Sequence, residues 1–320
     1  MSSRSLRAYG GRRLTAGRRH LQEASRARQL LYVVLLVLLV VYLSPLWSGL
    51  MTSLKTPTGF ARTLPYAPPT PEYFILEPWG DAADRLQGGM INSILFVIPA
   101  TVLSAFLGSL AAFGLTKIDW RGQVAILLLF VGGVFLPYQS VLVPLRQFWS
   151  LVDISGIMLT IAGALAFAPV LPGFFELLAA KADLIELTIT HTAYGIPICT
   201  VLFRGYYFTI DDDIIEAAKI DGASLFRIYR RIVLPLSTPM FAVTLIYQFT
   251  NIYNDLLFAL VLVTTSRNHV ATQALTQLQG AMVGQYNLQM AGAFIVALPT
   301  LIIYVLFGKQ FAEGITGAGY

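Results

Sequence analysis

Charge and cysteine are both scarce in this 320-residue chain. Charged residues make up 12% of it, against about 25% in an average soluble protein, whereas 56% of the residues are hydrophobic and the mean hydropathy is +0.68. The sequence is therefore that of an integral membrane protein. Its single cysteine, Cys199, lies inside an apolar run, which excludes a disulfide framework and a cysteine metal site and favours a role in core packing.

Motifs for catalysis and nucleotide binding are also missing. Gly308-Lys309 has neither the upstream glycine nor the following hydroxyl of a phosphate-binding loop. The three histidines are far apart, and no cluster of His, Cys and acidic residues offers a metal or nucleophile site. We therefore expect a non-catalytic chain with no catalytic residue, metal or cofactor of its own. His191 lies within a predicted span, and two roles are open for it. One is a contact with a substrate or a proton. The other, which is favoured, is that of a hydrogen-bonded packing residue.

Positive charge is concentrated at the N-terminus. Residues 1–28 hold eight arginines against one acid, Glu23. No aromatic interleaving or recognition fold accompanies them, so nucleic-acid binding is not indicated. The positive-inside rule instead predicts a cytoplasmic tail followed by a helix that leads outward. Because no small-residue cleavage site follows that helix, we expect it to be retained rather than removed as a signal peptide.

Six apolar stretches approach the roughly 20 residues that a helix needs to cross a bilayer. They predict an all-α polytopic membrane protein with a transmembrane domain over residues 29–308. The expected spans are Leu30–Leu50, Gly89–Leu115, Gln123–Leu145, Leu187–Phe208, Met240–Val263 and Leu288–Phe307. Residues 55–88 are polar and rich in proline, which predicts an extended extracytoplasmic segment. Residues 264–287 are polar and are also placed outside.

A seventh apolar stretch, residues 155–182, is interrupted by prolines and by Glu176. The basic tail and the charged stretch near residue 216 must both be cytoplasmic, which requires an even number of crossings between them. Four spans already supply that number. We therefore expect residues 155–182 to form a re-entrant or interfacial hairpin on the outer side, with two very short crossings as the alternative.

Residues 209–238 form the longest charged, helix-favouring stretch in the second half of the chain. Thr209 and Asp211–Asp213 supply an N-cap and acids that favour the start of a short helix. This helix contains Glu216, and Gly222 is expected to end it. Such a water-compatible segment between apolar spans predicts contact with something soluble.

A second short helix is expected after Gly222. Ser224 is placed to cap it, and Arg227, Arg230 and Arg231 have the spacing of one basic face. Pro235 is expected to end it. The stretch therefore predicts two short helices joined at a glycine.

This stretch resembles the EAA loop of the membrane subunits of bacterial ABC importers, in which Glu-Ala-Ala, a glycine and a Leu-Pro pair recur at fixed spacing. Glu216-Ala217-Ala218, Gly222 and Leu234-Pro235 match that pattern, and Asp221-Gly222-Ala223 with Pro239 is typical of the carbohydrate branch. The resemblance implies coupling helices that dock into a cleft on the ATPase. The implied coupling residues are Glu216, Ala217, Ala218, Asp221, Gly222, Ala223, Arg227, Leu234 and Pro235.

The fifth span is unusual because polar and aromatic groups recur along it. Tyr247, Asn251, Asn254 and Asp255 follow i, i+4, i+7 and i+8 spacing and are expected on one helix face. A charge inside a span usually faces a cavity or a partner. Together with Gln248, these residues are the candidate lining of a translocation path, with hydrogen bonds between subunits as the alternative.

The rest of the resemblance runs from the second span to the C-terminus. The tail, residues 309–320, resembles the ending of the maltose-type permease, which implies a contact of Gly314, Thr316 and Gly317 with the ATPases. The segment that begins Tyr194-Gly195-Ile196-Pro197 is most similar to glucose- or mannose-type permeases.

The resemblance implies a carbohydrate ABC importer permease of the type I fold, with about six transmembrane helices, a cytoplasmic coupling loop and an extra outer hairpin. Its implied partners are an ATPase dimer that binds ATP and magnesium, a second homologous permease, an extracytoplasmic sugar-binding protein and the lipid bilayer. The implied location is the inner or plasma membrane, with both termini cytoplasmic. A glucose- or mannose-type monosaccharide or a small glucoside is the expected substrate. The alternatives are a secondary transporter without an ATPase and a membrane scaffold or signalling component.

Overall fold

The computed structural model describes residues 3–165, 167, 170–281 and 284–316, with side chains described in these ranges except at 3–27, 280–281 and 309–316. The described residues form helices joined by short turns, without a β-strand among them. They divide into two compact units, residues 1–78 and residues 79–320.

The first unit is built on one long helix, α1 (Ser3–Ser53), of which Arg28–Ser53 is long and apolar enough to cross a membrane. Its leucines and valines between positions 30 and 43 are exposed on all sides, as expected of a helix whose solvent is lipid. A short helix, α2 (Pro57–Arg62), follows. The expectation of an extended segment is therefore wrong here, because Thr56 caps a helical turn by accepting the Gly59 N–H at 3.1 Å.

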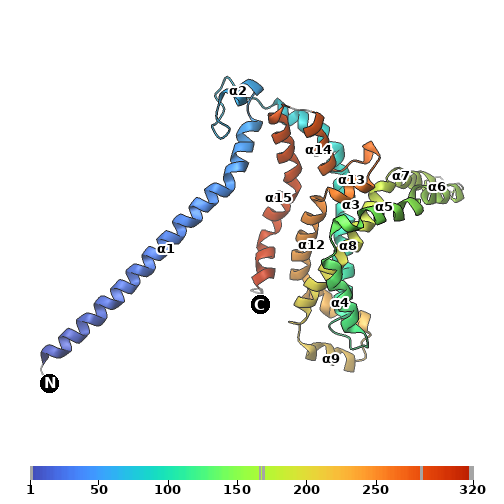
Figure 1. Ribbon diagram of the computed structural model, residues 1–320. Coiled ribbons are helices and arrows are strands. Elements are labelled where there is room, and N and C mark those ends of the chain that lie inside the picture. The colour runs from blue at the N-terminus through green and yellow to red at the C-terminus, as the bar shows by residue number, and fades with distance from the viewer. Residues whose placement is uncertain (1–2, 166, 168–169, 282–283, 317–320) are drawn as a thin grey trace. The chain divides into compact units, whose positions relative to one another are not determined.

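The second unit is a helical bundle (Figure 1). Its long helices are α3 (Glu77–Gly114), α8 (Ala182–Tyr207), α12 (Thr238–Tyr253) and α15 (Tyr286–Thr316). Helix α12 packs against α8 and α15, and the shorter α4 (Gln123–Val134) packs along α8. A β-carbon at Gly108 would lie 2.4 Å from Cβ of Cys199, so glycine allows α3 to approach α8 closely.

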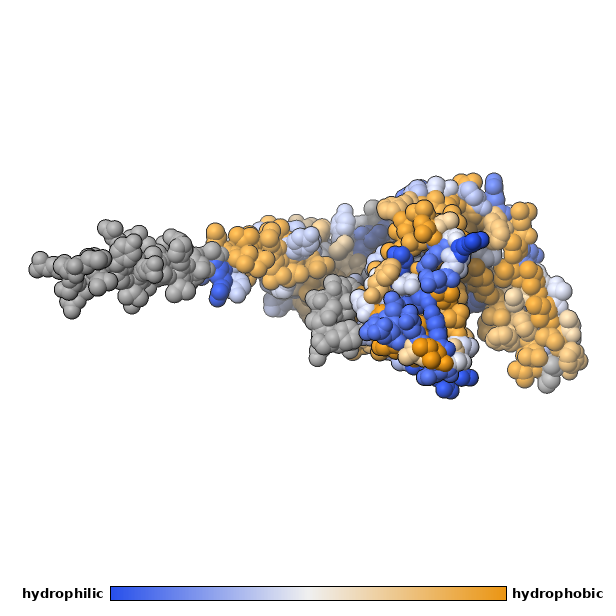
Figure 2. All heavy atoms as spheres, turned by 90° about the horizontal axis from the view of Figure 1, so that it is seen from below, coloured by the Kyte–Doolittle hydropathy of each residue, from blue (hydrophilic) through white to orange (hydrophobic). Residues whose placement is uncertain are grey.

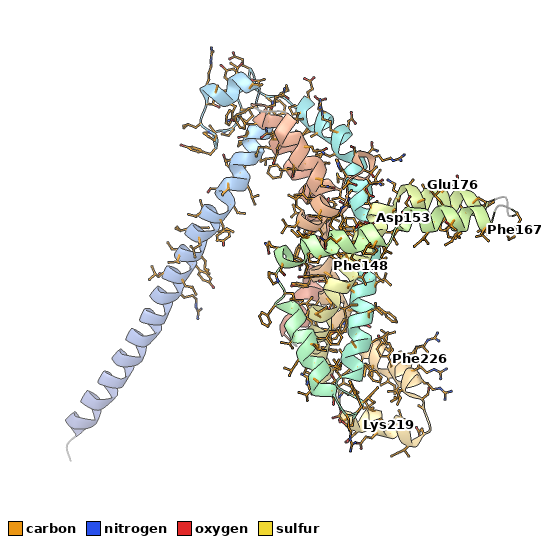
Figure 3. The ribbon with its side chains drawn as sticks, turned by 45° about the vertical axis from the view of Figure 1, so that its right-hand side comes forward. Phe148, Asp153, Phe167, Glu176, Lys219 and Phe226 are labelled. Carbon is orange, nitrogen blue, oxygen red and sulfur yellow. The ribbon has the colours of Figure 1, made fainter. Side chains whose placement is uncertain are left out.

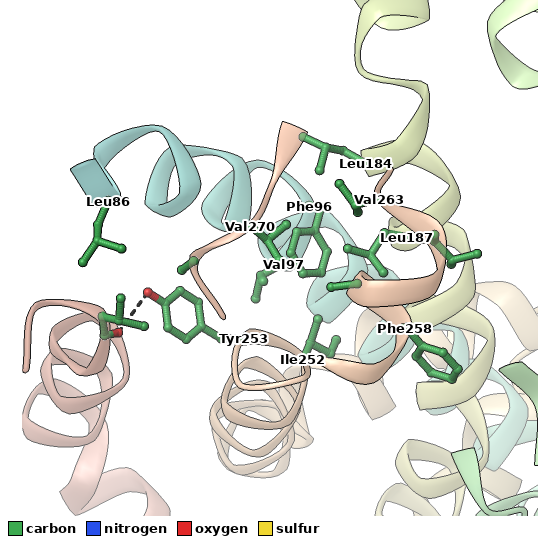
Figure 4. Packing of buried hydrophobic residues seen from close by; sticks show 14 of the residues in the cluster. Leu86, Phe96, Val97, Leu184, Leu187, Ile252, Tyr253, Phe258, Val263 and Val270 are labelled. Atoms are coloured by element: carbon green, nitrogen blue, oxygen red, sulfur yellow. Dashed lines mark hydrogen bonds between the residues drawn. The ribbon is translucent and has the colours of Figure 1, made fainter. Parts of the chain in front are cut away.

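Two apolar clusters hold this bundle together. The first lies around Phe96, Leu187 and Phe258, and Tyr253 ties it to α15 by donating its hydroxyl to the Val296 carbonyl at 3.0 Å (Figure 4). The second contains Cys199 among other buried residues of α3, α8 and α12. Cys199 is fully buried, in agreement with its expected packing role.

Two of the expected spans are broken helices. The third expected span ends as a helix at Val134, and α5 (Tyr138–Leu151) begins after residues 135–137. Pro137 explains this break, because proline lacks an N–H and restricts the preceding residue. The fifth is interrupted at residues 254–256, after which α13 (Leu257–Leu262) begins.

The expected outer hairpin consists of two helices, α6 (Ile154–Ala164) and α7 (Leu171–Ala180), which pack against each other. They extend away from the bundle, with Phe167 at the far end and Glu176 on α7 (Figure 3). The structure contains no membrane, so the re-entrant or interfacial placement stays a prediction. The polar segment after α13 is also partly helical, since it holds α14 (Ala271–Ala281).

Four helical segments of the described chain are long and apolar enough to cross a membrane: Arg28–Ser53, Glu77–Gly114, Tyr138–Ala164 and Tyr286–Gly308. A fifth is counted if Leu225–Leu236 and Thr238–Tyr253, bent by 77° at their junction, act as one span. The expected number of six is not reached by length and composition. The expected bounds also shift, because α3 begins at Glu77 and α15 continues to Thr316.

Candidate functional site

The charged stretch forms two short helices at one end of the bundle. Helix α9 (Asp212–Ile220) is capped by Asp211, whose side chain accepts the Asp213 N–H at 3.0 Å, and not by Thr209. Gly222 then turns the chain with φ of +75°. Ser224 caps the second helix, α10 (Leu225–Ile228). The expected arrangement of a helix, a glycine and a second helix is therefore present.

The second helix does not end at Pro235. Helix α10 continues as a π-helical turn, η1 (Tyr229–Val233), and then as α11 (Leu234–Leu236). The π-helical turn is wider than an α-helical one and leaves room before Pro235, which has no N–H to donate. Such turns are frequent at functional sites. The chain bends only at Ser237, where α12 follows.

Buried side chains fix this two-helix loop, residues 209–238, to the bundle. Ile215, Ile228 and Val233 belong to the second apolar cluster, together with Tyr229. Ser109 on α3 lies within hydrogen-bond distance of two hydroxyls, that of Tyr207 on α8 at 2.6 Å and that of Tyr229 on η1 at 2.8 Å. We call these three side chains the hydroxyl triad. It joins α3 and α8 to the loop through buried hydrogen bonds, which are costly to leave unmade.

Lys117, just after α3, makes a second connection to the loop. Its ammonium donates to the Ile210 carbonyl at 2.7 Å and to Asp212 at 2.5 Å. The lysine side chain is only 2% exposed, whereas that of Asp212 is 76% exposed. The buried charge therefore holds the first turn of α9 against the end of α3.

The outer face of the two-helix loop combines charge with exposed apolar groups. Ile220 is 86% exposed and Phe226 67% exposed, and Arg227 and Lys219 lie beside them in sequence. Figure 3 shows Lys219 and Phe226 on the loop at the end of the bundle, and Figure 2 shows a hydrophilic patch at that end within a largely hydrophobic surface. Large apolar side chains exposed among charges are typical of a surface that a protein partner covers.

The expected coupling residues divide between this face and the anchor. Ala218, Ala223 and Leu234 are partly buried and pack against the second cluster. The remaining ones are exposed: Glu216, Ala217, Asp221, Gly222, Arg227 and Pro235.

A small polar cavity lies between three helices of the bundle. It measures about 50 Å³ and is lined by residues of α5, α8 and α12. The structure brings together three of the expected path residues there, Tyr247, Gln248 and Asn251. Sequence reasoning missed two tyrosines that also line it, Tyr138 and Tyr194, whose rings stack at 4.7 Å between centroids.

The expected helical face does not extend to Asn254 and Asp255, because α12 ends at Tyr253. Asn254 is exposed and donates to the Thr250 carbonyl at 2.8 Å. Asp255 accepts the Phe258 N–H at 3.0 Å, at the start of α13. In this apolar run, the polar residues Asn254 and Asp255 mark the end of a helix as well as a candidate lining of the translocation path.

His191 lies beside this cavity and is 4% exposed. Its ring stacks with Phe96 at 5.7 Å and meets Phe258 edge-on at 5.3 Å. The favoured expectation of a hydrogen-bonded packing residue is wrong in one respect, because Nε2 has no hydrogen-bond partner among the described residues. The nearest carboxylate oxygen, Oδ2 of Asp255, lies 3.5 Å away.

The remaining expectations concern the C-terminus and metal binding. Gly314 and Thr316 lie in the last turns of α15, and their side chains are outside the described set, as is all of Gly317. Among the described residues, no group of three or more His, Cys, Asp and Glu side chains is placed to hold a metal ion.

Comparison with known proteins identifies the family of this chain. Residues 89–312 match the family described as binding-protein-dependent transport system inner membrane component. The chain is 47% identical to the xylose/arabinose import permease protein XacI of Haloferax volcanii over 89% of this chain and 90% of that protein, and 28% identical to the glucose import system permease protein GlcU of Saccharolobus solfataricus over 90% and 93%.

A solved structure shares the fold. A chain of a bacterial ABC transporter involved in the import of the acidic polysaccharide alginate matches with a TM-score of 0.62 and 18% identity, over 90% of this chain and 98% of that one. The family match covers more than half of the chain and includes the whole two-helix loop. The chain therefore belongs to the family of inner membrane components of binding-protein-dependent transport systems, the permease subunits of ABC importers.

Proposed function

We propose that this chain is a membrane-spanning subunit of an ATP-driven sugar importer, and that its two-helix loop transmits movement from a separate ATPase. The observation that carries this proposal is a loop that is exposed on one face and anchored on the other. Ile220 and Phe226 are free to enter a cleft on a partner, while Tyr229 and Lys117 hold the loop to the spans.

The mechanism follows from those anchors. An ATPase dimer would bind ATP and magnesium and close, and its closure would displace α9 and α10. Lys117 and the hydroxyl triad would pass that displacement to α3 and α8, since neither contact can break without leaving buried polar groups unpaired. Rigid movement of packed helices then exposes the path to one side or the other.

The polar cavity supports a path between the helices. Tyr247, Gln248 and Asn251 offer hydroxyl and amide groups, and aromatic rings offer apolar faces, which together suit an uncharged polyhydroxylated solute. Asn254 and Asp255 continue the path beyond the end of α12. The cavity is too small for a whole sugar, so the path must widen during transport.

The assembly needs further proteins. A second, homologous permease would complete the path, and an extracytoplasmic sugar-binding protein would deliver the solute. The coupling loop and both termini would face the cytoplasm, so that Gly314, Thr316 and Gly317 can reach the ATPases.

The names of the relatives support a neutral monosaccharide or small glycoside as the substrate. The relative at 47% identity is named for xylose and arabinose, and relatives at 28–29% identity are named for glucose and for alpha-glucosides. Higher identity over nearly the full length favours an aldopentose, with glucose or mannose as the second candidate.

Sugar uptake by cells that lack this chain tests the proposal. We expect uptake of D-xylose, L-arabinose or D-glucose to be lost and to return when the chain is restored, and the tagged chain to co-purify with a nucleotide-binding subunit. Uptake that persists after depletion of cellular ATP, with no such subunit recovered, would favour a secondary transporter instead.

A further inference from the structure

The buried nitrogen of His191 is the starting point. A polar atom that is shielded from water and lacks a hydrogen bond costs about 1–3 kcal/mol. Its ring is held between Phe96 and Phe258, so it is fixed in orientation and cannot turn to find a partner elsewhere. The protein thus keeps, beside a polar cavity, a buried nitrogen that has no hydrogen bond and lies 3.5 Å from a carboxylate oxygen.

Asp255 lies beside this nitrogen but outside the lining of the cavity, so a hydroxyl group reaches both only when the path widens. The 3.5 Å between His191 Nε2 and Asp255 Oδ2 exceeds the usual hydrogen-bond length, whereas an oxygen atom placed to one side can reach both at about 2.8 Å. A hydroxyl can donate its one proton to the carboxylate while it accepts the Nε2–H of the imidazole. Asp255 uses one contact to hold the Phe258 N–H and has acceptor capacity left.

Both neighbouring spans are interrupted at this level of the bundle. The α4–α5 break at residues 135–137 is followed by Tyr138, and the α12–α13 break at residues 254–256 contains Asp255. Transporters commonly bind their solutes where helices are discontinuous and a cavity satisfies the freed polar groups. The stacked rings of Tyr138 and Tyr194 line the cavity, and Tyr138 is 39% exposed.

We propose that His191 and Asp255 form a hydroxyl-binding subsite for a neutral sugar within this subunit, with Tyr138 as the surface on which the sugar ring packs. This inference rests on the proposed function and adds a direct contact between this chain and the solute. The cavity of about 50 Å³ accepts one edge of the ring, a hydroxyl with its carbon, while the rest of the sugar lies against the exposed side of Tyr138.

A series of monodeoxy sugars separates this contact from a structural role. Cells carry the wild-type chain, His191→Phe, which keeps the ring packing, or His191→Gln, which keeps a nitrogen donor. His269→Phe is the matched control, because His269 is outside the cavity. Initial uptake is measured for D-xylose, L-arabinose and D-glucose, and for the monodeoxy analogues of whichever is taken up.

The subsite predicts that His191→Phe lowers uptake of the parent sugar about tenfold or more and that His191→Gln loses less. It also predicts that one analogue, which lacks the hydroxyl bound by His191, is taken up poorly by the wild-type chain. His191→Phe should not lower uptake of that analogue further, because the missing hydroxyl and the missing imidazole are partners. The subsite would be overturned if His191→Phe lowered uptake of the parent sugar and of every analogue by the same factor. It would also be overturned if both variants kept the wild-type ratio of analogue uptake to parent uptake. Either result would leave the importer proposal intact. If the wild-type chain supports uptake of none of the three sugars, these monosaccharide assignments and the subsite fail, and the importer proposal fails as well if no nucleotide-binding subunit co-purifies with the chain.

Discussion

Gly222 adopts a left-handed backbone conformation, with φ of +75°, at the point where α9 and α10 join. Residues with a β-carbon pay about 1–2 kcal/mol to adopt it. A β-carbon at this position would meet no other atom within 4 Å, so the cost of substitution is conformational and not a clash. The position therefore allows a clean test of how much the angle between the two helices matters.

Gly222→Ala is expected to lower ATP-dependent uptake roughly five- to thirty-fold, the factor that corresponds to 1–2 kcal/mol. Gly222→Asn should be affected less, since asparagine tolerates the left-handed region. Gly205→Ala is the matched control, because Gly205 is exposed, has similar free space and lies inside α8. Uptake rates at equal amounts of membrane-inserted protein provide the measurement, and equal activity of all three variants would show that the joint is not strained on substitution.

At the same scale, Lys117 shows where sequence reasoning stops. Its role depends on Ile210 and Asp212, which lie more than ninety positions away and meet it only in the folded chain. The residue types of the loop itself could be predicted, since Gly222 and Ser224 act through their own backbone. Long-range pairs leave no local pattern, which is also why Tyr138 and Tyr194 were missed as cavity residues.

At the scale of elements, the π-helical turn η1 is the link between the loop and the spans. Tyr229 is its first residue and completes the hydroxyl triad with Ser109 and Tyr207. Continuous apolar runs predicted the long helices well, but hydropathy alone does not reveal where a helix is interrupted inside such a run. Pro137 and Asp255 mark those breaks, because each lies between two helices inside one apolar run.

Removal of one hydroxyl from the triad should loosen coupling without unfolding the bundle. Tyr229→Phe deletes a buried hydrogen bond worth about 1 kcal/mol and keeps the aromatic packing against Phe113. We expect less sugar transported per ATP hydrolysed, measured in proteoliposomes that hold the purified importer. Tyr42→Phe, on the exposed face of α1, is the control and should leave that ratio unchanged. A normal ratio for Tyr229→Phe would show that the triad does not transmit movement.

At the scale of the whole molecule, the two-helix loop divides the chain's tasks. The bundle presents apolar surface to lipid, and the patch at the end of the bundle presents charge and protruding apolar side chains (Figure 2). Family membership and the all-helical fold could be predicted from the residue pattern of the loop and from hydropathy. The number of crossings could not, because α4 and α5 share one apolar run and the α6–α7 hairpin is as apolar as a span.

The central claim is that the two-helix loop lies in the cytoplasm and is covered by an ATPase. Labelling of Phe226→Cys with a membrane-impermeant maleimide tests it most directly, in a Cys199→Ala background and with Tyr66→Cys as the control for the outer side. We predict that Phe226→Cys reacts in inside-out but not in right-side-out vesicles, and that the bound ATPase protects it, whereas Tyr66→Cys shows the opposite sidedness. Labelling of Phe226→Cys from the outside of right-side-out vesicles would contradict the account.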